Sequence, residues 1–267
     1  MSKAFLQQAD EYVSLEYGAS MKEGVRITCV RGFPALFAES LKNLCYAKKV
    51  KFTRVKHPSM GKDRKTGEDR QSRLFELTSQ KSVPTMWFNE ERPRSVWTEQ
   101  LALVERVGSG PKLVPDDMAL RCEMFGICAL ILAEDGLVWN NRIRRDSPLA
   151  RKYGFSNAAS KEAPKKISKI LNLLCNKLEA QKARGSKFIV GDALTAADIY
   201  LATMSYMFVV PSEEFLPRTK QTKLLDLMFG NNSPEVQKEL KPILVEHRDF
   251  IIKTFCEFPV NNGGDPL

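Results

Sequence analysis

The chain has 267 residues, of which 43% are hydrophobic and 27% charged, a balance typical of a globular protein with one large domain or two ordinary ones. This composition excludes collagen-like, fibrous and wholly disordered proteins. The longest apolar stretch, Phe125 to Ala133, is far shorter than the ~20 residues that cross a bilayer. The first ten residues lack the apolar core and cleavage site of a secretion signal, so we expect a cytoplasmic protein without a membrane span.

The six cysteines are scattered, at positions 29, 45, 122, 128, 175 and 256. The sequence holds no Cys-x-x-Cys pair, and its only histidines, His57 and His247, stand far apart. Disulfide frameworks are typical of small secreted chains, and zinc sites need closely spaced Cys and His ligands. We therefore expect reduced, buried thiols and no metal site.

The net charge of +9 is concentrated in one segment. Ten basic and three acidic residues lie between Lys48 and Arg73, so that segment alone carries +7. Its only aromatic residue is Phe52, which leaves no row of rings for stacking nucleobases. We interpret the segment as a solvated basic loop or as a site for a small anion, and nucleic acid is the least favoured partner.

The first part of the chain predicts a β-α-β unit. Weak helical character over 4–17 precedes a β-branched run at 25–30, which predicts a strand. A helix is expected over 34–45, with Pro34 in its first turn, and a second strand at 50–55. A crossover helix of this kind connects parallel strands.

A polar loop follows, and then the order of elements changes. The pattern predicts a short helix over 70–79, a strand at 82–88 and an antiparallel return strand at 94–97. The next helix is expected from Thr98, whose hydroxyl could cap it.

Glycine and proline over 108–116 predict a linker between two domains. We therefore divide the chain into an N-terminal extension (1–24), an α/β domain (25–107), the linker and an all-helical domain (117–267). In the last of these, long helices are predicted over 118–133 and 163–183, the second with an apolar stripe formed by Ile167, Ile170, Leu171, Leu174 and Leu178.

The strongest local signal is the segment from Gly191 to Ile199. Thr195 can cap a helix with its hydroxyl, and Asp198 stands at the position from which its carboxylate can reach back to the cap. Leu194 can pack on Ile199 as a hydrophobic staple. Taken alone, this pattern predicts only that a helix starts here.

Together with the α/β half, however, this segment resembles the buried capping element of the helical domain in the glutathione transferase superfamily. Two further motifs fit that resemblance. Val83-Pro84 is similar to the valine and cis-proline that precede the family's third strand, and Glu99-Gln100 falls where the family has an acidic residue followed by serine.

Other segments point to particular branches of the superfamily. Phe37-Ala38-Glu39 resembles a motif of omega-type members, whereas 134–139 and 247–250 look like an uncharacterised bacterial branch. The resemblance covers roughly 25–259. It implies a thioredoxin-like N-terminal domain followed by an all-helical C-terminal domain, and a homodimer, which is usual in the family.

The resemblance also implies a glutathione site. The backbone of Val83, turned by a cis bond at Pro84, would pair with the cysteinyl part of glutathione. Glu99 would meet the ammonium of the γ-glutamyl end, and Gln100 with the N–H groups of its helix start would meet the carboxylate. The candidates for the glycyl carboxylate are basic residues of the charged loop, namely Lys62, Arg64 and Lys65.

The sequence departs from the family at the catalytic position. Active members place Tyr, Ser or Cys near the start of the first helix, where the resemblance puts Ala35 in this chain. Alanine cannot hold or replace a thiolate with its side chain. Thr28 and Cys29, in the preceding strand, are weak substitutes, because strand residues of these types usually pack in a core.

Two functions therefore stay open. One is an enzyme that conjugates glutathione to a hydrophobic electrophile, which would sit near Met124, Phe125 and Cys128, although these residues also fit a core stripe. The other is a non-catalytic binding or structural protein of the same fold, as Ala35 suggests. A disulfide reductase of the omega type is disfavoured because the catalytic cysteine is missing.

Overall fold

The computed structural model describes residues 12–220, 222, 225 and 229–263. The chain divides into two compact units, of which unit 1 comprises 1–110, 212–223 and 257–267, and unit 2 comprises 111–211 and 224–256. The first crossing from unit 1 to unit 2 falls inside the predicted linker. Two later segments return to unit 1, whereas the sequence assigned everything from 117 onward to one helical domain.

Unit 1 is built on a four-stranded sheet with the strand order β1-β3-β2-β4. Strands β2 (Val25–Cys29) and β3 (Phe52–Lys56) are parallel, and α2 (Leu36–Ala47) connects them, as the predicted β-α-β unit requires. Strand β4 (Met86–Phe88) runs antiparallel to β2. All five residues of β2 are buried, because this central strand is paired on both edges and covered on both faces.

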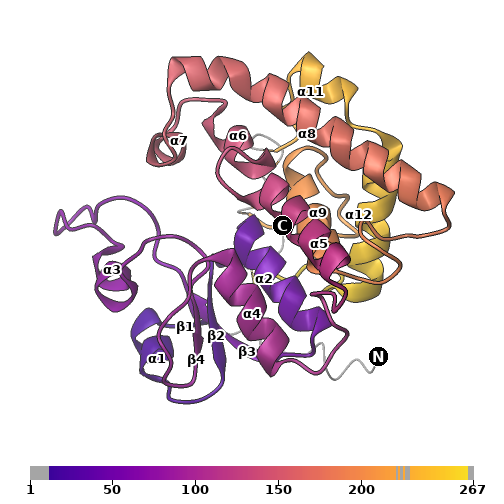
Figure 1. The fold of residues 1–267 in the computed structure, drawn as a ribbon. Coiled ribbons are helices and arrows are strands. Elements are labelled where there is room, and N and C mark those ends of the chain that lie inside the picture. The colour runs from indigo at the N-terminus through magenta and orange to yellow at the C-terminus, as the bar shows by residue number, and fades with distance from the viewer. Residues whose placement is uncertain (1–11, 221, 223–224, 226–228, 264–267) are drawn as a thin grey trace. The chain divides into compact units, whose positions relative to one another are not determined.

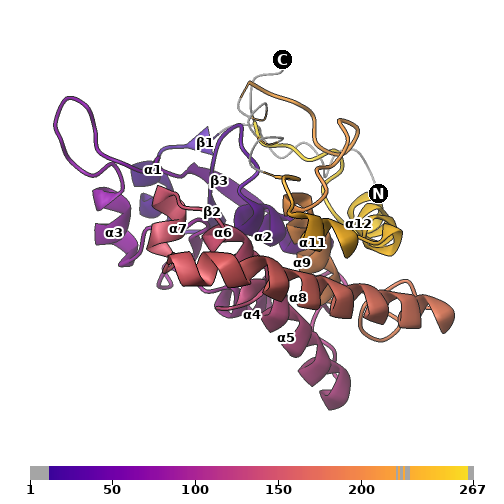
Figure 2. The same cartoon turned by 90° about the horizontal axis from the view of Figure 1, so that it is seen from above.

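Helices cover both faces of this sheet (Figures 1 and 2). On one face, α1 (Leu15–Ser20) and α3 (Ser72–Thr78) supply Leu15 and Leu74 to a core cluster with Val55 and Trp87 of the sheet. On the other face, α2 packs against α4 (Trp97–Val107). The unit is a small thioredoxin-like layered structure.

Several predictions for unit 1 need correction. Part of the supposed extension joins the sheet, because β1 (Tyr12–Val13) pairs in parallel with β3; residues 1–11 lie outside the described residues. The expected return strand is reduced to a bridge between Arg94 and Met86, since α4 already begins at Trp97. Its N-cap is Val96 rather than Thr98.

Unit 2 is helical throughout its described parts. Its elements are α5 (Met118–Leu132), α6 (Leu137–Ile143), α7 (Pro148–Lys152), α8 (Asn157–Ala183), α9 (Ala196–Met204), the 3-10 turn η2 (Ser205–Met207), α11 (Pro234–Lys238) and α12 (Pro242–Phe255). All nine residues of α9 are buried, because this helix packs against both α5 and α12. This mostly apolar helix therefore lies in the core of the unit, with Asp198 as a buried polar residue.

The capping box predicted at the start of α9 is present. Asp198 Oδ2 accepts hydrogen bonds from Thr195 N–H at 2.9 Å and from the Thr195 hydroxyl at 2.8 Å. Its other oxygen, Oδ1, accepts from Ile189 N–H at 2.7 Å and lies 3.0 Å from His247 Nε2. The box thus extends into a buried hub that ties α12 and the 189–195 segment to α9.

Among the described helices, none combines the length and the apolar character that crossing a bilayer requires. The described His, Cys, Asp and Glu side chains do not gather in any group of three that could hold a metal ion.

Candidate functional site

The segment that enters β4 contains a cis peptide bond between Val83 and Pro84, in agreement with the resemblance. Pro84 is buried, whereas Val83 is only half-buried. Among the hydrogen bonds of the described residues, none uses the backbone N–H or C=O of Val83. These two groups can therefore pair with an extended ligand in the way an added strand does.

Hydrogen bonds from β2 hold this segment in place. Thr28 N–H donates to Thr85 O at 2.9 Å, and Thr85 N–H donates to Thr28 Oγ1 at 2.7 Å. Gln80 reinforces the same turn, because its amide donates to Thr85 Oγ1 and accepts from Ser82 N–H. Thr28 is fully buried and its side-chain oxygen supports the loop, so the structure corrects its candidacy as a catalytic residue.

The start of α4 lies beside the cis-proline loop. Gln100 is 4% exposed, and its Nε2 donates to Pro84 O at 3.1 Å and to Arg94 O at 3.2 Å. Both amide hydrogens are thus used inside the protein, which corrects the prediction that this amide would donate to a ligand carboxylate. The backbone N–H groups in the first turn of α4 still make an anion-binding end.

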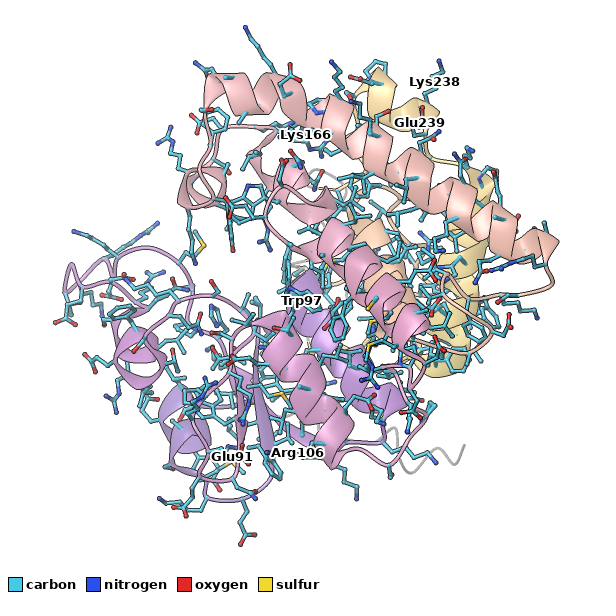
Figure 3. The ribbon with its side chains drawn as sticks, viewed as in Figure 1. Glu91, Trp97, Arg106, Lys166, Lys238 and Glu239 are labelled. Atoms are coloured by element: carbon cyan, nitrogen blue, oxygen red, sulfur yellow. The ribbon has the colours of Figure 1, made fainter. Side chains whose placement is uncertain are left out.

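Glu99, in that first turn, has a side chain that is 32% exposed and pairs with Arg92 Nη2 at 2.5 Å. It is accessible to the ammonium group of a ligand, which would compete with Arg92. The loop from β4 to α4 is also held by Glu91, which accepts hydrogen bonds from Arg94 and Arg106 (Figure 3). The loop and the helix start therefore form one fixed edge of unit 1.

The turn from β2 into α2 carries the position of the missing catalytic side chain. Ala35 is the N-cap of α2 rather than a residue of its first turn, and no side chain caps this helix. Ala35 O accepts from Ala38 N–H at 2.7 Å and from Glu39 N–H at 3.0 Å. What this turn offers a thiolate is the helix end itself, with its backbone N–H groups and partial positive charge.

Cys29 cannot substitute for the missing group. Its side chain is 1% exposed, and its Sγ lies 3.7 Å from Ile27 O. Burial raises the pKa of this thiol to about 12, so it stays protonated near neutral pH. The structure therefore corrects Cys29 to a core residue.

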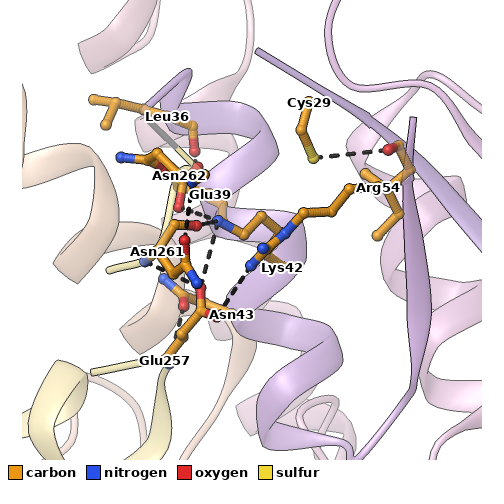
Figure 4. Close-up of polar contacts among 12 residues, drawn as sticks. Cys29, Leu36, Glu39, Lys42, Asn43, Arg54, Glu257, Asn261 and Asn262 are labelled. Carbon is orange, nitrogen blue, oxygen red and sulfur yellow. Dashed lines mark hydrogen bonds and ion pairs between the residues drawn. The ribbon is translucent and has the colours of Figure 1, made fainter. Parts of the chain in front are cut away.

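Behind the same turn, a buried cluster of charges binds the returning C-terminal segment (Figure 4). Lys42 Nζ lies 2.8 Å from Glu39, 3.4 Å from Glu257 and 2.9 Å from Asn261 O. Glu257 also pairs with Arg54 Nη2 at 3.1 Å. Glu39, part of the omega-like motif, is thus used in an internal ion pair.

The segment also reaches the β2–α2 turn directly. Gly32 N–H donates to Asn262 O at 2.8 Å, and Arg31 Nε donates to Gly263 O at 2.9 Å. A cavity of about 340 Å³ in unit 1 is lined by Pro217, Thr219 and residues 257–263. It does not include Val83 or Glu99, so it is separate from the predicted glutathione site.

The basic loop between β3 and α3 exposes all three residues proposed for the glycyl carboxylate, Lys62, Arg64 and Lys65. Its turn is shaped by Asp63 Oδ1, which accepts from Lys65 N–H at 2.8 Å and from Thr66 N–H at 3.2 Å. Sequence reasoning missed Lys81, which pairs with Asp69 of this loop. The available signal was its place two residues before Val83.

The residues predicted to contact a hydrophobic substrate lie on α5 in unit 2. Met124 and Cys128 are fully buried, with Cys128 Sγ 3.5 Å from Met124 Sδ. They belong to the core of the helical unit, which corrects their assignment to a substrate surface. Phe125, on another side of the helix, is partly exposed.

Comparisons with known proteins agree with this architecture. Residues 138–228 match the family described as glutathione S-transferase, C-terminal domain. Comparison with curated protein sequences found no match.

Solved structures share the fold across most of the chain. A glutathione S-transferase domain-containing protein from Marinobacter aquaeolei VT8 superposes with a TM-score of 0.57 at 13% identity, covering 86% of this chain and 98% of its own. A glutathione transferase family member from Pseudomonas fluorescens Pf-5, solved with two glutathione bound, has a TM-score of 0.53 at 14% identity. The match covers 87% of this chain and 96% of its own. Yeast Ure2p in complex with glutathione has a TM-score of 0.53 at 11% identity. The match covers 85% of this chain and 98% of its own.

A thioredoxin-like unit with a cis-proline before its last strand, combined with an all-helical unit, defines the glutathione transferase fold. The predicted fold class is confirmed. The family match lies in the helical unit, at residues 138–228, and the solved structures share the glutathione transferase fold over most of the chain.

Proposed function

We propose that this protein binds glutathione in unit 1, along Val83 and the start of α4. The backbone N–H and C=O of Val83, which no hydrogen bond of the described residues uses, carry this proposal. The cysteinyl part of glutathione pairs with that backbone. Its γ-glutamyl carboxylate meets the N–H groups of the first turn of α4, and its ammonium meets Glu99. The complexes of Ure2p and of the Pseudomonas protein with glutathione support this assignment.

The glycyl carboxylate then has basic partners nearby in the chain. Lys81 stands two residues before Val83, and its ion pair with Asp69 connects it to the basic loop. We assign the carboxylate to Lys81 together with the loop residues Lys62, Arg64 and Lys65. This arrangement explains why so much positive charge is concentrated in one segment of unit 1.

The proposed reaction is conjugation of the bound thiol to a small hydrophobic electrophile. The thiolate sulfur bonds to an electrophilic carbon, and the leaving group departs with its electron pair. Because Ala35 has no donor and Cys29 is buried, thiolate stabilisation falls to the N-terminal N–H groups of α2.

The second candidate is a non-catalytic member of the superfamily that binds glutathione without turning it over. The absence of a side-chain donor at Ala35 favours this alternative. By resemblance to the family, we also propose a cytoplasmic homodimer.

Calorimetric titration with glutathione tests the binding proposal. Glu99→Ala should weaken binding by about 1–3 kcal/mol, roughly 5- to 150-fold, because the ligand ammonium loses its carboxylate partner. Glu90→Ala is the matched control, since Glu90 is an exposed carboxylate paired with Lys22 at 2.8 Å. An unchanged dissociation constant in a folded Glu99→Ala protein contradicts the assignment.

The same preparation then separates the two functions. Turnover of an aryl halide by the glutathione-bound protein supports the enzyme. Binding without turnover supports the non-catalytic alternative, and failure to bind glutathione overturns both.

A further inference from the structure

Two arginines at the end of α6 in unit 2 share a single hydrogen-bond acceptor. Arg144 is the C-cap of this helix, and its Nη1 donates to Asn231 O at 2.6 Å. Arg145 Nη2 donates to the same oxygen at 3.2 Å. Two full positive charges therefore meet at a carbonyl group that carries none. Like charges at such short separation repel, and a bound anion would relieve that repulsion.

Neither arginine has a carboxylate partner among the described residues. The nearest acid in sequence, Asp146, is already used, because it pairs with Arg151 through hydrogen bonds of 2.8 and 2.7 Å. Burial, together with the charge of Arg145, lowers the pKa of Arg144 to about 10. Within the described part of the chain, no carboxylate therefore compensates the charge of this pair.

Two asparagines, one on α6 and one next to Asn231 in the sequence, carry side-chain acceptors that lack donors. Asn141 precedes the C-cap Arg144 by three residues, so it lies on the face of α6 that leads to Arg144. Its Nδ2 lies 3.2 Å from Met207 Sδ, and its Oδ1 is buried with no hydrogen-bond partner. Asn232 Nδ2 donates to Phe208 O at 2.8 Å, and its Oδ1 is likewise buried without a partner.

The parts of this site are fixed by the surrounding backbone. Gly230 N–H donates to Met207 O at 2.9 Å, which holds the 230–232 segment against the end of α9 and η2. From α8, the Ser160 hydroxyl donates to Arg144 O at 2.7 Å. A ligand would therefore meet guanidinium groups whose backbone is already fixed, which reduces the entropic cost of binding.

The surrounding sequence attracts anions. Between Arg142 and Lys169 there are nine basic and two acidic residues, a net charge of +7. This equals the charge of the loop segment in unit 1, so the remainder of the chain is net acidic. On α8, Lys161, Lys165 and Lys169 recur every four residues and are exposed, whereas Lys166 (Figure 3) pairs with Asp135 at 2.6 Å.

We propose that Arg144 and Arg145, with the amides of Asn141 and Asn232, form a binding site for a small phosphate monoester. The planar forks of two guanidinium groups match the oxygens of a phosphate. A phosphate monoester monoanion also carries a hydroxyl, which can donate to an Asn Oδ1 that now has no donor. Sulfate and carboxylate offer the charge without this donor. The proposal is independent of glutathione binding in unit 1.

The test is calorimetric titration of the full chain with phenyl phosphate at pH 6, where about half of a phosphate monoester keeps its hydroxyl. Ionic strength is held constant with sodium chloride. Arg144→Gln and Arg145→Gln should each weaken binding about tenfold, the loss expected for a charge-assisted hydrogen bond. Arg144→Lys should also weaken binding, because it keeps the charge but loses the fork.

Lys165→Gln is the control, since it removes one exposed charge from the same basic segment. It should change affinity less than about twofold, because screening weakens a distant charge. Equal losses in Lys165→Gln and the arginine variants would show a diffuse charge effect and overturn the site.

Two further titrations complete the test. Sulfate should bind the parent more weakly than phenyl phosphate does. The Asn141→Leu protein should bind sulfate and phenyl phosphate with equal affinity. If sulfate binds the parent as tightly as phenyl phosphate, the asparagines have no role and the proposal fails. Binding of an oligonucleotide or polyglutamate without any binding of phenyl phosphate would indicate a macromolecular partner, and would also overturn it. If Arg144→Gln does not fold, the exposed Arg145 still provides the test.

Discussion

The buried hub at Asp198 allows a quantitative prediction for unit 2. In Asp198→Ala, Ile189 N–H, Thr195 N–H and the Thr195 hydroxyl lose their acceptor, and His247 loses its partner. Asp198 is 0% exposed, so water cannot replace the carboxylate without rearrangement of the helix start. The substitution therefore removes the connection between three parts of the unit.

The expected loss follows from these contacts. A hydrogen bond to a charged group contributes about 1.5–3 kcal/mol. The four contacts share one side chain and do not add independently, so we expect a total loss of about 3–5 kcal/mol, as for other broken buried pairs. For a protein of this size, each kcal/mol lowers the melting temperature by about 2–4 °C, which corresponds to roughly 6–20 °C.

Urea unfolding followed by circular dichroism measures the change in the free energy of unfolding. Asp192→Ala is the matched control, because Asp192 is an exposed carboxylate in the same segment. It should stay within about 0.5 kcal/mol of the parent. Asp198→Asn keeps one acceptor oxygen, so its free energy of unfolding should lie between those of Asp198→Ala and Asp192→Ala. If Asp198→Ala unfolds within about 1 kcal/mol of the parent, the hub does not stabilise the unit as we infer.

Three further predictions concern unit 1 and the thiols. Ala35→Cys places a thiol at the positive end of α2, so its pKa should fall below about 8.5 and it should form a mixed disulfide with oxidised glutathione; mass spectrometry showing no adduct there would remove Ala35 from the site. All six cysteines lie in described residues, and only Cys122 is exposed. A thiol reagent at pH 8 should therefore modify one cysteine quickly in the native protein and all six after denaturation. Rapid modification of a second thiol in the native protein would contradict the burial of the other five. Glu257→Gln should lower the free energy of unfolding in urea by about 1–3 kcal/mol, because Lys42 and Arg54 lose a carboxylate partner in a buried cluster. The control Glu246→Gln, in an exposed pair with Lys182, should lower it by less than about 1 kcal/mol. Equal effects would show that the cluster contributes no more than a surface pair.

Much of the fold was predictable because its signals are short-range. The β-α-β unit appears as two β-branched runs separated by helical periodicity. The start of α9 appears as Thr195 and Asp198 three residues apart, and the chemistry of a cap involves only one helical turn. The cis bond at Pro84 was implied by a two-residue motif. Each of these features depends on residues that are neighbours in the sequence.

The elements that were predicted wrongly depend on distant partners. Strand β1 forms because Tyr12 and Val13 find the open edge of β3, about forty residues later in the chain. The return strand shortens to one bridge because α4 begins early. Neither outcome has a periodic signal in the sequence, since pairing is decided by which edge is available.

The sequence by itself determined which residue types stand near the candidate site, including the absence of a catalytic side chain at Ala35. Only the tertiary structure decided their roles. Gln100 reaches Pro84 O, 16 residues away in the sequence, and thereby supports the loop instead of donating to a ligand. Cys29 is inert because it is buried, and the Arg144–Arg145 pair becomes a candidate site because Asn231 meets both guanidinium groups. Burial and hydrogen-bond partners are set by contacts between residues far apart in the chain, and no local pattern contains that information.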